Sequence, residues 1–379
     1  MKIVIACDSF KEALAAAEAC EAVARGAHRA RPDADLDLIP MADGGEGTVA
    51  TLVAATRGTI REATVTGPLG EPVKAAWGLL GGDRRTAVLE MAAASGLGLV
   101  PRARRNPLLT TTYGTGQLIL AAIEAGAREI IIGIGGSATN DGGAGAAQAI
   151  GVRFFDGEGR PCPPGLSGGG LEDVDRIDLA ARDPRVAATT IRTACDVDNP
   201  LCGPGGAAAV YSPQKGATPE QVGLLDRNLA HLADLICRDL HVDVRHLPGA
   251  GAAGGLGAGL VAFFGATLQP GVRLVMEAVR FRERIADADL IITGEGRIDR
   301  QSMMGKVIAG VGHAAKAIGV PVIALAGCIG EGADQTLVVL KSYHPINTPG
   351  TPTAEALAHT AERLEAAAAT ILSQWPAVR

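Results

Sequence analysis

Short apolar runs alternate with amphipathic stretches along most of this chain, a pattern that predicts a parallel sheet covered by helices. Residues 3–7 form an apolar run typical of a buried strand. Ser9 followed by Glu12 matches a capping box, which predicts a helix over about residues 10–26. A strand near residues 36–39 and a second helix then complete a β-α-β-α unit.

The same alternation returns twice farther along the chain. A helix over about residues 115–125 precedes a strand over 129–134, and a strand over 289–293 is followed by a helix and a strand over 320–326. The last helix is expected to begin at Pro352, because proline is favoured in the first turn of a helix.

Two regions depart from this alternation. Residues 60–105 contain short alternating runs separated by turns at 67–70 and 81–83, which predicts an antiparallel meander. Residues 151–285 contain proline- and glycine-rich loops and one clearly amphipathic helix, which begins at a capping box formed by Thr218 and Gln221.

These patterns predict an α/β protein in which a second α/β domain is inserted into a flavodoxin- or Rossmann-like domain with a parallel sheet. The parallel-sheet domain is expected to comprise residues 1–59, 107–150 and 286–379. The inserted domain is expected to comprise residues 60–106 and 151–285.

Composition and charge exclude several classes of function. The formal net charge is −6 without a concentrated basic face, which argues against nucleic-acid binding. The sequence contains no run of about 18 apolar residues, so no membrane span is predicted. The seven cysteines are scattered without a CxxC pair, which argues against zinc and for a reducing compartment. We therefore expect a soluble, cytoplasmic protein.

Candidate chemistry lies in the loops after the predicted strands, where parallel sheets bind ligands. In the first loop, Asp8, Ser9 and Lys11 offer an acid, a hydroxyl and an amine that could contact metal, phosphate oxygen and negative charge. An ordinary capped helix with a solvated lysine explains the same residues equally well.

The sequence DGGxG occurs in two separate loops, at residues 43–47 and 141–145. Its glycines let the backbone approach an anion closely, and its acid could orient magnesium or a hydroxyl. Two ordinary tight turns are the alternative. Asp43 and Asp141 are thus candidate magnesium ligands. The candidate nucleotide-binding residues in these loops and in the loop after residue 134 are Gly44, Gly45, Gly47, Gly135, Gly136, Ser137, Gly142 and Gly143.

Two further loops contain candidate residues for catalysis and substrate binding. Asp196 follows a predicted strand, and Asn199 is close behind it, so a carboxylate is available to accept the proton of an attacking hydroxyl. Glu295 and Arg297 lie in a glycine-flanked loop, where an arginine suits recognition of a carboxylate or phosphate.

A series of long motifs resembles the first class of bacterial glycerate kinases across essentially the whole chain. The motifs, in order, are DSFKEAL, PMADGGEGT, TTYGTGQLI, IGIGGSATNDGGAG, CDVDNPLCGPGGAA, GLGAGL and ITGEGRID. The resemblance implies a flavodoxin-like domain with an inserted α/β domain, ATP and Mg²⁺ as cosubstrate and cofactor, and D-glycerate as acceptor. It also implies that the product is 2-phosphoglycerate.

For such a kinase we predict that Asp196 orients or deprotonates the glycerate hydroxyl. Lys11 is expected to stabilise charge on the transferring phosphoryl group, and Arg297 to bind the glycerate carboxylate. Asp8 is expected to contact magnesium or a hydroxyl. The remaining predicted substrate contacts are Ser9, Asn199 and Glu295.

Other functions compete with this interpretation. Residues 249–254 match GxGxxG, the fingerprint of dinucleotide-binding dehydrogenases, with Glu277 at a plausible distance, but no clean apolar strand precedes them. A non-catalytic nucleotide sensor would keep the phosphate-binding loops without needing Asp196. A kinase that makes 3-phosphoglycerate or acts on another short hydroxy acid also fits the sequence. A homodimer is a further expectation.

Overall fold

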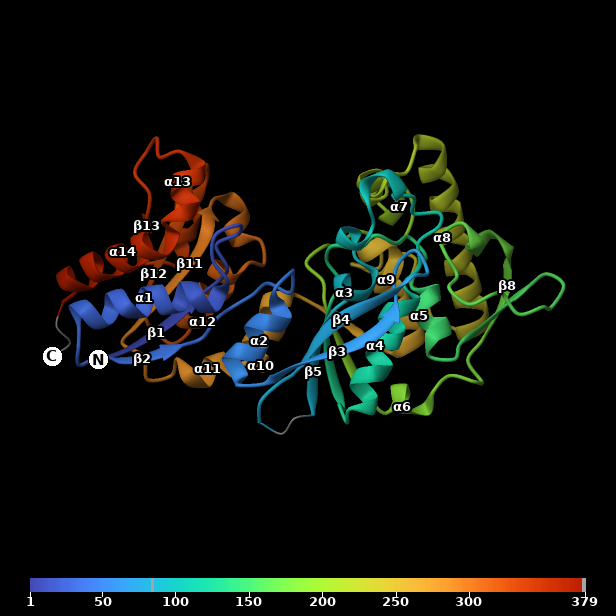
Figure 1. Ribbon diagram of the computed structural model, residues 1–379, viewed down its shortest axis with the longest axis horizontal. Helices are drawn as coiled ribbons and strands as arrows, with labels where there is room; N and C mark the ends of the chain where they lie inside the picture. The colour runs from blue at the N-terminus through green and yellow to red at the C-terminus, as the bar shows by residue number, and fades with distance from the viewer. Residues whose placement is uncertain (83–84, 377–379) are drawn as a thin grey trace. The chain divides into compact units, whose positions relative to one another are not determined.

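The computed structural model describes residues 1–82 and 85–376, so Asp83 of the predicted turn lies outside the described residues. The chain forms two compact units (Figure 1). Unit 1 comprises residues 1–43 and 50–57 and the chain from Gly271 onward. Unit 2 comprises Gly44–Val49 and Gly58–Pro270.

The sheet of unit 1 is parallel throughout, as the sequence predicted. Its strands lie in the order β13-β12-β11-β1-β2. Counted within the unit alone, this is the order 2-1-3-4-5 of flavodoxin-like folds, which confirms the predicted fold class. The strands are β1 (Lys2–Cys7), β2 (Asp35–Leu38), β11 (Leu290–Ile298), β12 (Val322–Ile329) and β13 (Ser342–Pro345).

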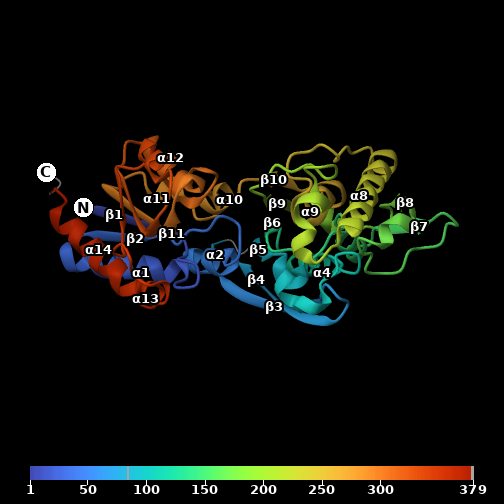
Figure 2. The same cartoon turned by 90° about the horizontal axis from the view of Figure 1, so that it is seen from above.

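Helices cover both faces of this sheet. Figure 2 shows α1 and α14 together on one face and α12 on the other. A Cβ atom on Gly26 of α1 would lie 2.1 Å from the backbone oxygen of Glu365, so the close approach of α1 to α14 requires glycine at this position. The helices that contribute to unit 1 are α1 (Ala16–Ala30), α2 (Thr48–Thr56), α10 (Gly271–Ala278), α11 (Phe281–Arg284), α12 (Val307–Lys316), α13 (Thr353–Ala358) and α14 (Thr360–Gln374).

The first helix begins later than the capping-box pattern predicted. Glu12 has a φ of +65°, which a helical residue cannot adopt, and Phe10 and Leu14 exchange two backbone hydrogen bonds of 2.9 Å. The segment after Asp8 is therefore an irregular loop. The carboxylate of Glu18 instead accepts a hydrogen bond from the backbone N–H of Ala15 at the true helix start.

Unit 2 contains a mixed sheet in the order β10-β9-β6-β5-β4-β3. β3, β4 and β5 pair antiparallel, which confirms the predicted meander, and β5, β6, β9 and β10 are parallel. The strands are β3 (Thr59–Thr66), β4 (Pro72–Leu79), β5 (Thr86–Glu90), β6 (Glu129–Gly133), β9 (Thr190–Ala194) and β10 (Thr267–Gln269). A separate hairpin pairs β7 (Arg153–Asp156) with β8 (Val174–Asp178).

Helices pack against this sheet and supply much of the unit's apolar core. The capping box of Thr218 and Gln221 is present at the start of α8, as the sequence predicted. The helices are α3 (Ala92–Ser95), α4 (Tyr113–Glu124), α5 (Ala144–Ala149), α6 (Pro184–Ala187), α7 (Ala207–Tyr211), α8 (Pro219–Leu240) and α9 (Ala252–Phe264). A short 3-10 helix at Pro213–Lys215 joins α7 to α8.

The division of the chain differs from the expected domains at residues 107–150. These residues were expected in the parallel-sheet domain, but β6 pairs with β5 and β9 and therefore belongs to unit 2. Apart from Gly44–Val49, unit 2 is thus one continuous insertion, Gly58–Pro270, between α2 and α10. Apolar periodicity predicts that β6 is a strand but not which sheet it joins.

Candidate active site

Unit 1 places several predicted residues where its strand order reverses. β1 and β11 are neighbours although they are far apart in the sequence, and ligands bind flavodoxin-like sheets at such a switch point. The backbone N–H of Asp8, just after β1, donates a 2.8 Å hydrogen bond to the carbonyl oxygen of Gly294 in β11. Glu295 is the next residue of β11, so Asp8 and Glu295 lie at the same end of the sheet.

Acidic groups at this point have perturbed pKa values. Burial, followed by the negative charge of Asp43, raises the pKa of Asp8 to about 7, although the Ser9 backbone N–H donates to its carboxylate at 2.6 Å. Glu295 is only 6% exposed, and burial raises the pKa of its carboxyl above the usual value. The Ser302 hydroxyl donates to Glu295, and the Lys306 charge also opposes this shift.

This acidic group fits a magnesium ion better than a metal bound by protein ligands alone. Among the described residues, no three His, Cys, Asp or Glu side chains come close enough to hold a metal together. Mg²⁺ needs only one or two carboxylates when substrate phosphates and water supply the other ligands. Asp8 and Asp43 can fill that role, because the negative charge of Asp43 disfavours the charged form of the buried Asp8 and a bound cation would relieve this.

The two predicted cations of unit 1 have different surroundings. Lys11 is exposed and lines a pocket of about 480 Å³ together with Gly296 and Asn347. Arg297 is also exposed, but its Nε donates to the Asp299 carboxylate at 2.8 Å. Arg297 therefore has to exchange this exposed ion pair for any contact with a substrate carboxylate.

In unit 2, the strand register gathers the other predicted loops along one edge of the sheet. Glu90 of β5 pairs with Gly133 of β6, which pairs with Ala194 of β9. The residues that follow these strands emerge side by side because the three strands are parallel. The loop at residues 135–137 and the loop containing Asp196 therefore start next to each other.

A glycine-lined pocket lies at this edge of unit 2. Its volume is about 510 Å³, and four of the predicted nucleotide-binding residues line it, namely Gly44, Gly45, Gly135 and Gly136. The structure thus brings together two loops that the sequence separates by about 90 residues. A pocket of this size, with exposed backbone amides, can hold a phosphorylated small molecule.

The backbone amide of Gly47 helps to hold a protein carboxylate, that of Glu90, at the start of α2. Glu90 accepts a 2.8 Å hydrogen bond from the backbone N–H of Val49, and the amides of Gly47 and Thr48 also stabilise its carboxylate. The start of α2 therefore already binds an acidic side chain of the protein. Burial nevertheless raises the pKa of Glu90 above its usual value.

The loop after β6 has backbone donors that no other described residue uses. The backbone N–H groups of Gly135, Gly136 and Ser137 donate no hydrogen bond within the part of the chain that the structure describes. Lys215 donates to the Ser137 hydroxyl oxygen at 2.7 Å and is almost fully buried. No sequence pattern pointed to Lys215, which lies far along the chain in an ordinary Pro-Gln-Lys-Gly turn.

The second DGGxG loop is buried, and the amides of Gly142 and Gly143, which were expected to bind nucleotide, are used within the protein. Their amides donate to the Gly254 carbonyl oxygen and to the Asp141 carboxylate. A Cβ on Gly142 would lie 2.3 Å from the Leu232 side chain, so this glycine permits close packing against α8.

Asp141 is likewise committed to holding its own loop. Its two carboxylate oxygens accept hydrogen bonds from the backbone and hydroxyl of Thr112, both at 2.7 Å, and from the amides of Gly143 and Gly145. Burial raises the pKa of Asp141, and the Thr112 donors oppose this shift. Because this fully buried carboxylate already accepts four hydrogen bonds, the geometry does not support the expected contact of Asp141 with magnesium.

Asp196 and Asn199 follow β9 but have unlike environments. Asp196 is exposed beyond the end of the strand, where a bound hydroxyl compound can reach it. The Asn199 amide donates to the Gly205 carbonyl oxygen at 2.8 Å, and its oxygen accepts a 2.6 Å hydrogen bond from Tyr211. Asn199 therefore shapes the loop that follows Asp196.

The GxGxxG sequence at residues 249–254 has no dehydrogenase context. No strand lies directly before it in the described part of unit 2, where it follows α8 and an irregular segment. Gly254 has a φ of +70°, and a Cβ there would lie 1.9 Å from the carbonyl oxygen of Thr139. These glycines permit close backbone packing beneath the 135–143 loop.

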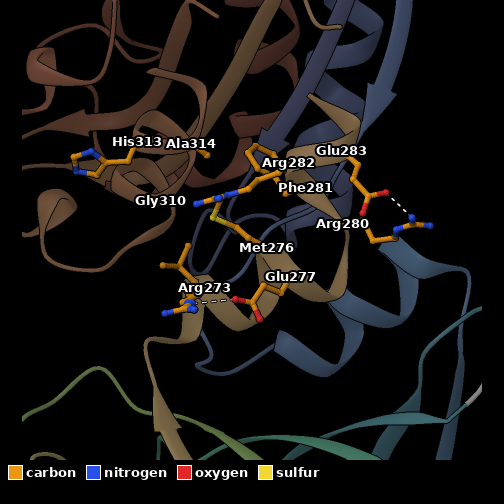
Figure 3. A pocket seen from close by; sticks show the side chains of 11 residues that line it. Arg273, Met276, Glu277, Arg280, Phe281, Arg282, Glu283, Gly310, His313 and Ala314 are labelled. Carbon is orange, nitrogen blue, oxygen red and sulfur yellow. Dashed lines mark hydrogen bonds and ion pairs between the residues drawn. The ribbon is translucent and has the colours of Figure 1, made fainter. Parts of the chain in front are cut away.

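A further pocket of about 700 Å³ lies in unit 1 among α10, α11 and α12 (Figure 3). Ion pairs of 2.9 Å and 2.5 Å join Arg273 to Glu277 and Arg280 to Glu283 along its lining. Its lining includes none of the predicted catalytic or nucleotide-binding residues. Its charged side chains thus largely neutralise one another.

Comparison with known proteins agrees with this arrangement. Residues 3–376 match the model of the glycerate kinase family. A glycerate kinase of Halalkalibacterium halodurans is 56% identical over 87% of this chain and 86% of its own. A glycerate 2-kinase of Escherichia coli is 54% identical over 87% of this chain and 86% of its own. A crystal structure from Salmonella typhimurium LT2, of a protein provisionally named glycerate kinase 2, has a TM-score of 0.91 and 50% identity over 98% of this chain and 97% of that chain.

The parallel sheet with its inserted unit and phosphate-compatible loops, together with these relatives, defines a kinase of small molecules. The chain belongs to the glycerate kinase family, and membership of a kinase family implies the use of ATP. Among the described residues, no helix is both long and apolar enough to cross a membrane.

Proposed function

We propose that this chain transfers the terminal phosphoryl group of ATP to the 2-hydroxyl of D-glycerate and thereby makes 2-phosphoglycerate. The observation that carries the proposal is the loop after β6, which presents three unused backbone amides beside a glycine-lined pocket. The choice of acceptor follows the glycerate 2-kinase of Escherichia coli, to which the chain is 54% identical.

In this proposal the nucleotide phosphates bind to the amides of Gly135, Gly136 and Ser137, while Gly44 and Gly45, which also line the pocket, allow close approach of the backbone. Bound Mg²⁺ would neutralise charge on the phosphate oxygens. Asp8 and Asp43 are its proposed protein ligands, because the negative charge of Asp43 disfavours the charged form of Asp8 unless a cation is present.

The acceptor is proposed to depend on exposed side chains. Asp196 orients the glycerate hydroxyl and takes its proton as the new O–P bond forms. Arg297 leaves Asp299 to bind the glycerate carboxylate, and Lys11 stabilises negative charge on the transferring group. Ser9, Asn199 and Glu295 act indirectly, since each already has a partner within the protein that shapes a neighbouring loop.

The test incubates purified protein with ATP, magnesium and D-glycerate, follows ADP release, and identifies the product by phosphorus NMR. A 2-phosphoglycerate signal is expected. A 3-phosphoglycerate signal would retain the kinase and correct the position of transfer. Absence of glycerate-dependent turnover, with ATP still bound, would favour another hydroxy acid or the nucleotide-sensor alternative. The expected homodimer remains a prediction that light scattering would test.

A further inference from the structure

Lys215 is a buried lysine without a role in the reaction proposed above. It ends the 3-10 helix at Pro213–Lys215 and is 2% exposed. Lysine is rarely buried unless an acidic partner compensates its charge. No ion pair in the described part of the chain includes Lys215, so the protein itself supplies no direct counter-charge.

The Lys215 ammonium group is instead held directly beneath the loop after β6. Its Nζ donates to the hydroxyl oxygen of Ser137 at 2.7 Å and to the carbonyl oxygen of Thr139 at 2.6 Å. Because Ser137 accepts this bond, its own hydroxyl proton is free to donate elsewhere. No acceptor for that proton is found among the described residues.

Neighbouring polar atoms are also incompletely paired. The Thr139 hydroxyl and the Asn140 side-chain nitrogen are buried without a hydrogen-bond partner within the described residues. The oxygen of the Asn140 side chain accepts from the Ser212 hydroxyl at 2.9 Å, so the 3-10 segment and the loop are joined at two points. Groups buried and left unpaired in this way are costly unless a ligand completes them.

We propose that Lys215 is a positioning residue for the nucleotide phosphates: it fixes the Ser137 hydroxyl as a donor and supplies positive charge beneath the three unused amides of residues 135–137. This inference rests on the proposed function, in which that loop binds phosphate. The loop alone offers only neutral donors, whereas a phosphate group carries up to two negative charges, one of which a buried ammonium can balance.

The pKa of Lys215 agrees with this role. Burial lowers the pKa of Lys215 to about 7, and the charge of Asp141 opposes the shift only in part. Asp141 is itself held by four donors and forms no hydrogen bond with Lys215. An incoming anion would favour the charged form of the lysine.

The experiment measures binding of magnesium-ATP in the absence of glycerate by isothermal titration calorimetry. Lys215→Met keeps the length and packing of the side chain but removes its charge. We expect its Kd for ATP to rise about 10-fold or more, as for loss of a hydrogen-bonded charged group. Lys74→Met, an exposed change on β4 of the same unit, is the matched control and should bind as the unchanged protein does.

Two results separate positioning from a purely structural role. The melting temperature of Lys215→Met should stay the same or rise, because the variant buries no uncompensated charge. In the assay, its KM for ATP should rise while its KM for glycerate stays unchanged. A lowered melting temperature with unchanged ATP affinity would assign Lys215 to structure and overturn the inference.

Ser137→Ala keeps the inference testable if Lys215→Met does not fold. This variant should weaken ATP binding, and in the double variant its effect should not add to that of Lys215→Met. Unchanged ATP affinity in Ser137→Ala would overturn positioning through Ser137. If the protein binds ATP but leaves glycerate unchanged, the proposed acceptor fails while this binding test still decides the role of Lys215.

Discussion

The switch point of unit 1 and the loop after β6 in unit 2 each contain a buried ionisable group, and the two groups carry opposite charge. Unit 1 collects acids at the switch point of its sheet, where burial and Asp43 raise the pKa of Asp8 to about 7. Unit 2 collects neutral donors and one lysine, and burial lowers the pKa of Lys215 to about 7. Lys306 opposes the shift of Glu295 in unit 1 and Asp141 opposes that of Lys215 in unit 2, but neither charge cancels the effect of burial.

The two regions differ in the charge of the ligand that would compensate their buried groups. Burying a charge without a partner lowers the stability of the folded protein. Sites that contain such groups are commonly functional. The acids of unit 1 would be compensated by a cation, and the donors of unit 2 by an anion. Magnesium and the phosphates of ATP are the corresponding pair in a kinase, and the predictions below test the two regions separately.

The largest expected effect is on turnover and concerns Asp196 in unit 2. Asp196→Asn should lower kcat by about 100-fold or more, because an amide cannot take the hydroxyl proton. ATP affinity and circular dichroism should not change. Asp198→Asn, two residues farther along the same loop, is the control with near-normal kcat. Near-normal turnover of Asp196→Asn would remove this residue from the mechanism.

The next effect concerns the acids of unit 1. Asp8→Asn should raise the Mg²⁺ concentration required for half-maximal activity by about 10-fold, since one charged ligand is lost. Titrating magnesium at saturating ATP and glycerate measures this. Asp33→Asn, an exposed change in the same unit, should leave the requirement unaltered. An unchanged requirement in Asp8→Asn would show that the acids of unit 1 do not hold the metal.

A smaller effect is expected at Arg297. Arg297→Ala should raise the KM for glycerate by about 10-fold with little change in the KM for ATP, because a charged hydrogen bond to the carboxylate is lost. Arg300→Ala removes a neighbouring exposed ion pair with Glu331 and serves as the control. An effect on the KM for ATP alone would reassign Arg297 to nucleotide binding.

The smallest effects are on stability, and the two regions should differ in sign. Between about pH 4 and about 7, the folded protein holds a proton on Asp8 that the unfolded chain has lost. The free energy of unfolding should therefore fall as pH rises through this range. Above about pH 7, the unfolded chain holds a proton on Lys215 that the folded protein has lost, so the free energy should rise.

Urea unfolding from about pH 5 to about pH 9 checks both slopes. Asp8→Asn should abolish the fall and leave the rise intact, and Lys215→Met should do the reverse. If both variants keep the pH profile of the unchanged protein, other groups determine it, and the contrast between the two regions loses this support.

The sequence alone determined the types of most elements and which loops contain the candidate residues. Apolar periodicity predicted β1, β6, β9, β11 and β12, because a buried strand must be apolar whichever sheet it joins. The glycines at residues 44–45 and 135–136 were identified because few other residues permit a backbone to approach a phosphate closely.

Tertiary structure alone decided how these parts combine. Strand pairing placed β6 in unit 2, and close packing turned Gly142, Gly143 and Asp141 into core elements although their loop repeats the sequence pattern of residues 43–47. Lys215 became a candidate only when the fold buried it beneath Ser137, about 80 residues away in sequence. Burial and strand pairing depend on contacts between distant segments, and a local sequence pattern contains no information about which segments will meet.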